Sequence, residues 1–87
     1  MATVHIPAPI RPLVGGATEA VAPGGTLGEV IANLEAAYPG VKDRLVEGDR
    51  MRRGMATFVN GVVVSPKLAT RIPEEAEIYF APAIAGG

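Results

Sequence analysis

The fold is decided by residues 26–40, which read TLGEVIANLEAAYPG. Thr26 and Glu29 form a capping box, in which the hydroxyl and the carboxylate each accept a backbone N–H at a helix start. Pro39 and Gly40 end the helix. Between these signals, apolar residues recur every three or four positions and form one stripe, made of Leu27, Val30, Ile31, Leu34 and Tyr38. The stretch therefore predicts one amphipathic helix that must cover another layer of structure.

Two short strands are predicted before this helix. Residues 3–6 alternate polar and apolar side chains, and the prolines and glycines of residues 7–16 then break the run. Residues 18–22 form a second strand that Pro23 and two glycines close. We expect these two strands to pair as a hairpin and the proline-rich segment between them to be a rigid turn.

A second hairpin and then a last strand are predicted after the helix, following a short helical turn within residues 41–47 and a loop at 48–50. The pair Asn60-Gly61 lies between the apolar residues Phe58-Val59 and Val62-Val63-Val64, and Asn-Gly is a strong hairpin signal. Residues 77–81 form the last strand. The order is β-β-α-β-β, which predicts an α+β fold with a mixed sheet covered by one main helix.

The bulk composition excludes several classes of protein. The 87 residues fit one domain, and 48% hydrophobic with 20% charged residues is typical of a compact fold. A net charge of -1 gives no general attraction to nucleic acid or anionic membranes. The absence of cysteine excludes disulfides and thiolate chemistry. No apolar run approaches a membrane span and no leader is recognisable, so we expect a cytoplasmic protein.

The last residues, 82–87, read PAIAGG and predict chemistry at the C-terminus. Glycine has no Cβ, so a Gly-Gly end can run extended through a narrow channel and bring the terminal carboxylate to a partner's active site. By our count of strands these residues have no ladder to join. The sequence thus predicts a domain over residues 1–81 and a flexible tail over residues 82–87, although a chance Gly-Gly end is the alternative.

Catalytic and metal sites are poorly supported elsewhere. Ser65 precedes a proline in a turn, and His5 lies on the first strand with no nearby partners for a triad or a metal, so we interpret it as an ordinary strand residue. The Gly15-Gly16 and Gly24-Gly25 pairs lack the lysine of a phosphate loop and are interpreted as turns. The helix start at Thr26 could still attract an anion.

Two charged groups and two aromatic residues are candidates for partner binding. Arginines 50, 52 and 53 and glutamates 74, 75 and 77 are interpreted either as solvated surface or as docking groups. Period-two alternation places Ile78 and Phe80 on the core face of the last strand, and Glu77 and Tyr79 on the outer face. Phe58 would share that outer face. We therefore expect a candidate partner surface made of Phe58, Tyr79 and Glu77.

The β-β-α-β-β order, the capping-box helix and the PAIAGG end together resemble the MoaD/ThiS family of ubiquitin-like β-grasp sulfur carriers. The resemblance covers the whole chain and is greatest to the branch that contains the cysteine-biosynthesis sulfur carrier. The matching residues are Ile6-Pro7, Ile10-Arg11-Pro12, Gly15-Gly16, Thr26-Leu27-Gly28, Leu34-Glu35, Tyr38-Pro39-Gly40, Arg44-Leu45, Val59-Asn60 and Leu68-Ala69-Thr70. The tail is the most specific motif.

The resemblance implies a cosubstrate with no catalytic residues, bound cofactor or metal of its own. An E1-like enzyme would use ATP and magnesium to adenylate the Gly87 carboxylate, and a sulfur donor would convert it into a thiocarboxylate. The acceptor enzyme would be cysteine synthase-like, or the large subunit of molybdopterin synthase, of which this chain would be the small subunit. Residues inserted into the partner would be Pro82, Ala83, Ile84, Ala85 and Gly86.

Two other functions remain open from the sequence. A ubiquitin-like modifier could be joined through Gly87 to lysines of other proteins, and a non-catalytic β-grasp binding module could carry an incidental Gly-Gly. Ubiquitin-type tails carry arginine before Gly-Gly, whereas residues 83–85 here are apolar. This difference favours a carrier whose tail enters an apolar channel.

Overall fold

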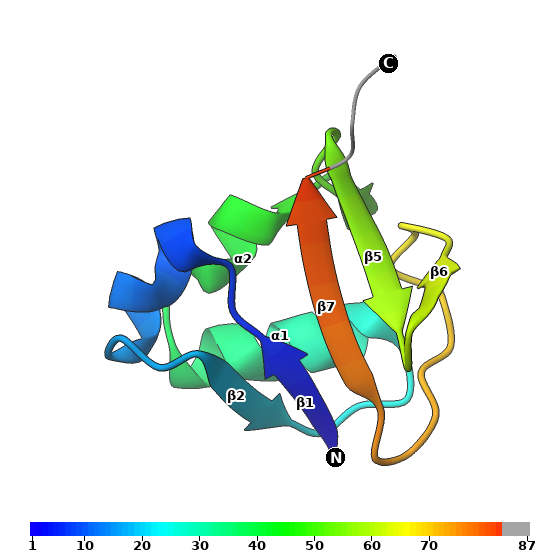
Figure 1. Ribbon diagram of the computed structural model, residues 1–87, viewed down its shortest axis with the longest axis horizontal. Coiled ribbons are helices and arrows are strands. Elements are labelled where there is room, and N and C mark those ends of the chain that lie inside the picture. The colour runs from blue at the N-terminus through cyan, green and yellow to red at the C-terminus, as the bar shows by residue number, and fades with distance from the viewer. Residues whose placement is uncertain (83–87) are drawn as a thin grey trace.

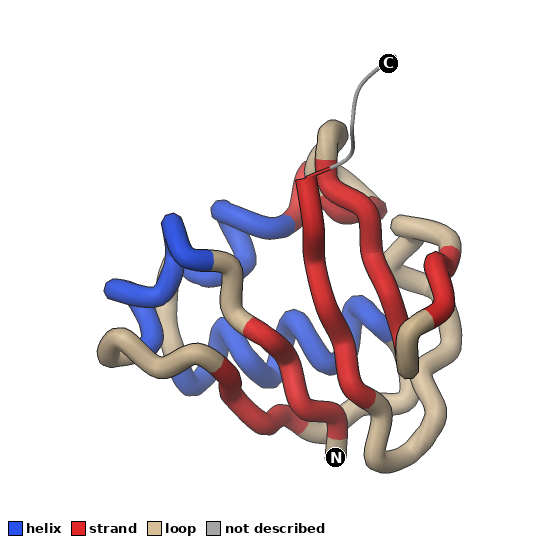
Figure 2. The backbone as a smooth tube through the Cα atoms, in the orientation of Figure 1, coloured by secondary structure: helices blue, strands red, loops and turns tan. Residues whose placement is uncertain are grey.

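The computed structural model describes residues 1–82 and contains a five-stranded mixed sheet with one long helix packed behind it (Figure 1). The tube view shows the same arrangement, with that helix passing behind the strands (Figure 2). Across the sheet, the strands follow the order β2 (Glu19–Ala22), β1 (Ala2–His5), β7 (Glu77–Pro82), β5 (Met55–Val59) and β6 (Val62–Val64). The expected α+β fold of the β-grasp type is confirmed.

The centre of the sheet is a parallel pair formed by β1 and β7. Val4 lies opposite Ile78, and Thr3 lies opposite Glu77. The other pairs, β1–β2, β5–β7 and β5–β6, are antiparallel. A parallel pair needs a long crossover connection, and here that connection contains the helical layer. Because β1 and β7 run in the same direction, the N-terminus and the end of β7 lie at opposite ends of the sheet (Figure 1).

The main helix, α1 (Leu27–Ala37), begins where the capping box predicted. The Thr26 Oγ1 accepts the N–H of Glu29 at 3.1 Å. The carboxylate of Glu29 accepts the N–H of Gly25 at 2.7 Å, one residue before the position that a standard capping box uses. The cap therefore also fixes the glycine turn that leads into the helix.

A loop after β6 covers the start of α1. The N–H groups of Leu27 and Gly28 donate to the carbonyl oxygens of Thr70 and Leu68, both at 2.8 Å. A Cβ on Gly28 would lie 3.1 Å from the backbone oxygen of Leu68, so this close approach favours glycine. These N–H groups are the ones that an anion would need. The expectation that the helix start could attract an anion is therefore wrong, because backbone carbonyls already occupy it.

The core lies between α1 and the sheet. Leu27, Val30, Ile31 and Leu34 are at most 1% exposed, as the stripe predicted, and Tyr38 is only partly buried at the helix end. Burying side chains of this size stabilises the fold by about 1.5–3 kcal/mol each. The other fully buried large side chains come from the sheet, from α2, from β4 and from the residue after β1, and they are Val4, Ile6, Val41, Leu45, Met51, Thr57 and Ile78.

The proline-rich segment that we expected to be a plain turn is instead a 3₁₀ helix, η1 (Ala8–Val14). Proline is tolerated at a helix start because the first N–H groups have no partner inside the helix. Ile10 and Val14, four residues apart, both face the core and are buried. The helix ends at Gly15, whose φ of 69° is in the left-handed region. The packing of Ile10 and Val14 against the core determines this helix, whereas the prolines of the segment had indicated a turn.

A second short helix, α2 (Val41–Leu45), follows the end of α1 and matches the predicted helical turn in part. The Glu35 carboxylate accepts the N–H of Lys42 at 2.8 Å and that of Gly40 at 3.1 Å. The hydrogen bond from the Lys42 backbone, then that from Gly40, lowers the pKa of Glu35 below its usual value. The carboxylate of α1 thus caps the start of α2.

Residues 46–51 form a small hairpin where the sequence predicted the end of a helical turn and a loop. Strand β3 (Val46–Glu47) pairs with β4 (Arg50–Met51), and Gly48 in the turn has a φ of 68°. The Asn60-Gly61 hairpin between β5 and β6 is present as predicted, with φ of 51° and 83° at the two turn residues. Positive φ at both positions is what a type I′ turn requires.

Candidate functional site

Strand β7 carries the chain to one end of the sheet, opposite the end where the N-terminus lies (Figure 1). Pro82 is still part of β7 and lies opposite Met55 in the antiparallel pair with β5. The expectation that residue 82 has left the ladder is therefore wrong by one residue, because β5 begins early enough to face it. The predicted tail residues Ala83, Ile84, Ala85, Gly86 and Gly87 lie outside the described residues.

No catalytic constellation is assembled within residues 1–82. The Ser65 Oγ accepts the backbone N–H of Lys67 at 3.3 Å, which is a turn contact. In this part of the chain no group of three or more histidine, aspartate or glutamate side chains is placed to hold a metal ion. None of the helices in the described region is long and apolar enough to cross a bilayer.

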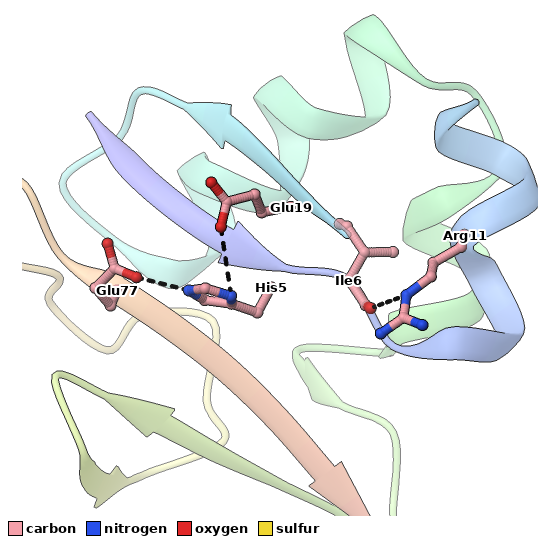
Figure 3. A network of polar contacts seen from close by, with 5 residues as sticks. All are labelled: His5, Ile6, Arg11, Glu19 and Glu77. Atoms are coloured by element: carbon pink, nitrogen blue, oxygen red, sulfur yellow. Dashed lines mark hydrogen bonds and ion pairs between the residues drawn. The ribbon is translucent and has the colours of Figure 1, made fainter. Parts of the chain in front are cut away.

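His5 lies in a polar network on the outer face of the sheet (Figure 3). Its Nε2 is 2.6 Å from the Glu77 Oε1, and its Nδ1 is 3.8 Å from the Glu19 Oε2. The imidazole ring stacks on Tyr79 with 3.8 Å between ring centroids and an angle of 4°. The sequence interpretation of His5 as an ordinary strand residue missed this arrangement. Only the parallel pairing of β1 with β7 places His5 beside Tyr79.

Phe58 lies directly opposite Tyr79 in the β5–β7 pair, so both rings are on the outer face, as the alternation predicted. Tyr79 is 45% exposed, whereas Phe58 is half-buried. Val63 continues the row on β6 and is 62% exposed. We call these three residues with His5 and Glu77 the outer-face patch. That a partner contacts Phe58, Tyr79 and Glu77 stays a prediction.

The five strands of the sheet contain no lysine or arginine. The outer-face patch contains one carboxylate, that of Glu77, and a second carboxylate, that of Glu19, lies on the other side of His5. Both glutamate side chains are about half exposed. A partner that covers this patch would therefore meet apolar and aromatic area with acidic groups at one side.

A groove of about 450 Å³ lies where β7 ends. Its lining consists only of apolar side chains and glycine, drawn from the start of η1, the start of β5 and the end of β7: Pro7, Ala8, Pro9, Gly54, Met55, Phe80, Ala81 and Pro82. The Arg11 Nε donates to the Ile6 carbonyl oxygen at 3.0 Å and thereby ties η1 to the end of β1 (Figure 3). No sequence signal indicated this groove, because its three walls are far apart along the chain.

The charged groups singled out in the sequence have separate roles. The Arg50 Nε donates to the Met51 carbonyl oxygen, and the Arg52 guanidinium donates to the Asp43 carbonyl oxygen, so both are used within the fold. Arg53 is exposed and forms no ion pair with another residue of 1–82. Glu75 lies 3.4 Å from the N-terminal amine. Arg53 directly precedes the groove residue Gly54. Of the three arginines, it is therefore the candidate for contact with a partner beside the groove.

Comparison with known proteins places this geometry in a family. The chain is 40% identical to the sulfur carrier protein CysO of Mycobacterium tuberculosis over 98% of this chain and 97% of that protein. The crystal structure of M. tuberculosis CysO superposes with a TM-score of 0.85 at 36% identity, covering 97% of this chain and all of the other.

Two further structures share the fold. The crystal structure of the BexX/CysO complex of Amycolatopsis orientalis matches with a TM-score of 0.87 at 32% identity, with both chains fully covered. SAMP1 of Haloferax volcanii has a TM-score of 0.68 at 19% identity over 99% of this chain and 98% of the other, which shows the fold alone. The ThiS family profile matches residues 4–87, and the chain belongs to the ThiS family.

Proposed function

We propose that this chain is a sulfur carrier whose Gly87 carboxylate is adenylated by an E1-like enzyme and then converted into a thiocarboxylate. The relation to CysO, at 40% identity over nearly the full chain, carries the proposal. As a member of its family the chain is a small carrier rather than a catalyst. The direction of β7 supports the same function, since it brings the chain to one end of the sheet with five residues still to follow.

The chemistry needs no side chain from this protein. The Gly87 carboxylate attacks the α-phosphorus of ATP, and pyrophosphate leaves with the bridging oxygen. In the resulting acyl adenylate the acyl carbon carries AMP, which is a good leaving group. Hydrosulfide from a sulfur donor attacks that carbon, AMP departs, one proton is released, and the C-terminus is a thiocarboxylate. The partner enzyme binds the ATP and the magnesium that the adenylation uses.

The outer-face patch supplies docking area for the activating enzyme. Phe58 and Tyr79 present two neighbouring rings, and aromatic residues of this kind often contribute most of the binding energy at an interface. The His5 ring holds Tyr79 from the other side through the stacked contact. A ring that is already fixed loses little side-chain entropy on binding, so this arrangement favours docking.

The experiment combines the intact chain with its cognate E1-like enzyme, ATP, magnesium and sodium sulfide. We expect release of pyrophosphate and a mass gain equal to one exchange of oxygen for sulfur, located at Gly87 by fragmentation. Deletion of Gly87 should abolish both signals, and so should one residue added after Gly87, because misplacing reacting groups by an ångström costs about a hundredfold in rate. Thiocarboxylate formation on the extended chain without trimming would refute the proposal.

The sulfur acceptor is tested separately. We favour activated serine, which gives cysteine, because the chain is 40% identical to the sulfur carrier protein CysO over nearly its full length. A molybdopterin precursor is the second acceptor. The thiocarboxylated chain should transfer sulfur with a cysteine synthase-like enzyme and activated serine, and transfer only with a molybdopterin synthase large subunit would reverse this preference. Conjugation to lysine side chains, without sulfur transfer to either acceptor, would instead support a ubiquitin-like modifier.

A further inference from the structure

We infer that the groove at the end of β7 receives a large apolar side chain from the rim of the partner's tail channel, placed beside a carboxylate that pairs with Arg53. The inference rests on the proposed function, since it concerns the enzyme that activates Gly87. It assigns a second contact surface, separate from the outer-face patch.

The length of the tail forces the partner close to the groove. Five residues follow Pro82, and a fully extended chain of that length spans at most about 18 Å. An enzyme that takes Gly87 into a closed active site must therefore bring the mouth of its channel near Pro82. Pro82 is itself a wall of the groove, and Met55 lies opposite it in the ladder. Whatever forms the mouth of the channel meets the groove.

The chemistry of the groove selects an apolar side chain. All of its lining side chains are apolar, whereas a site for a small metabolite normally carries a few convergent polar groups. Its volume of about 450 Å³ leaves room for a large aliphatic or aromatic side chain. Three of the lining residues are prolines, so the walls are stiff and binding orders little backbone. Water would leave apolar area on both sides of the contact.

Arg53 determines which charge a partner group beside the groove should carry. It directly precedes the groove residue Gly54, it is exposed, and it pairs with no carboxylate of residues 1–82. The other two arginines of this segment donate to backbone carbonyls within the fold. A carboxylate on the partner would meet the one arginine of the three whose side chain forms no hydrogen bond or ion pair within residues 1–82.

The first test places a charge in the groove. Ala8 is the first residue of η1, and Ala17 follows the end of that helix. Both alanines are exposed, but only Ala8 lines the groove. With the full-length chain and the cognate E1-like enzyme, Ala8→Glu should raise the KM for the carrier by about tenfold or more, because a carboxylate would be buried against apolar surface. The kcat at saturating carrier should stay unchanged, and Ala17→Glu should behave as the wild type does.

Arg53 has its own variant and control. Arg53→Glu should also raise the KM without changing kcat, whereas Arg44→Glu, which makes the same charge change on α2, should not. Equal KM values for Ala8→Glu and Ala17→Glu, with normal thiocarboxylate formation by both, would overturn the groove contact and leave the proposed function standing. Failure of the wild-type chain to react at all would instead overturn the proposed function, and this inference with it.

Cross-linking identifies the partner side chain directly. The chain contains no cysteine, so Ala8→Cys can be labelled at one site with a thiol-reactive benzophenone before the enzyme is added. Irradiation should attach it to an enzyme peptide at the channel mouth that contains a large apolar residue near Asp or Glu. Labelled Ala17→Cys should give no such product. A cross-link of equal yield from both positions, or none from position 8, would refute the contact.

Discussion

Replacing Thr57 by valine should stabilise the protein. Thr57 lies in the middle of β5, is 1% exposed, and its Oγ1 has no hydrogen-bond partner within the described chain. Its neighbours across the sheet are Phe80 on β7 and Val64 on β6, both packed against the core. The hydroxyl therefore sits in an apolar environment, where it has lost its hydrogen bonds to water and gained none in return.

The magnitude follows from the cost of that unpaired group. A buried donor or acceptor without a partner costs about 1–3 kcal/mol. Valine has almost the same shape as threonine and keeps the β-branched side chain that favours a strand, so the exchange creates neither a cavity nor overpacking. We expect Thr57→Val to raise the free energy of unfolding by about 1–2 kcal/mol. For a domain of this size, 1 kcal/mol raises Tm by about 4–8 °C.

Urea denaturation followed by circular dichroism measures the change. Thr3→Val is the matched control, because Thr3 is a strand residue of the same sheet that faces outward, opposite Val21. It should change stability little. If Thr57→Val leaves the denaturation midpoint unchanged or lowers it, the hydroxyl has a partner, such as a buried water, and the argument from an unpaired group is refuted. Sulfur loading of the variant should be normal, since Thr57 faces away from the outer-face patch.

Three further predictions concern the core face of α1, the cap of α2 and the outer face of the sheet. Leu34→Ala should lower the free energy of unfolding by about 2–5 kcal/mol, since Leu34 is fully buried; an unchanged urea midpoint would show that the core is elsewhere. Glu35→Gln should destabilise the protein at neutral pH. The lowered pKa of Glu35 makes its contribution present above the ordinary carboxyl value and lost as the pH falls through the folded-state value. The difference in stability between the two proteins should thus shrink in urea titrations as the pH falls below the ordinary glutamate value of about 4.3, and a difference that stays constant there would contradict the cap. Phe58→Ala and Tyr79→Ala should each weaken binding to the activating enzyme by about 1–2 kcal/mol in calorimetry without unfolding the chain; equal affinity for the double variant would remove both from the interface.

The candidate site was predictable only in part. The outward direction of Phe58 and Tyr79 follows from period-two alternation, because successive side chains of a strand point to opposite faces. The stack of His5 on Tyr79 does not follow, because residues 74 positions apart meet only through the parallel pairing of β1 with β7. The groove has the same origin, since its walls come from the start of η1, the start of β5 and the end of β7.

By itself, the sequence determined the elements that depend on near neighbours. The helix beginning at Thr26 and the turn at Asn60-Gly61 form as predicted, because capping hydrogen bonds and positive φ values act within a few residues. Only the tertiary structure decided the rest. Residues 8–14 form a helix because Ile10 and Val14 reach the core, and Pro82 stays in the ladder because Met55 lies opposite it. Such contacts join distant segments, and no local pattern encodes which segments meet.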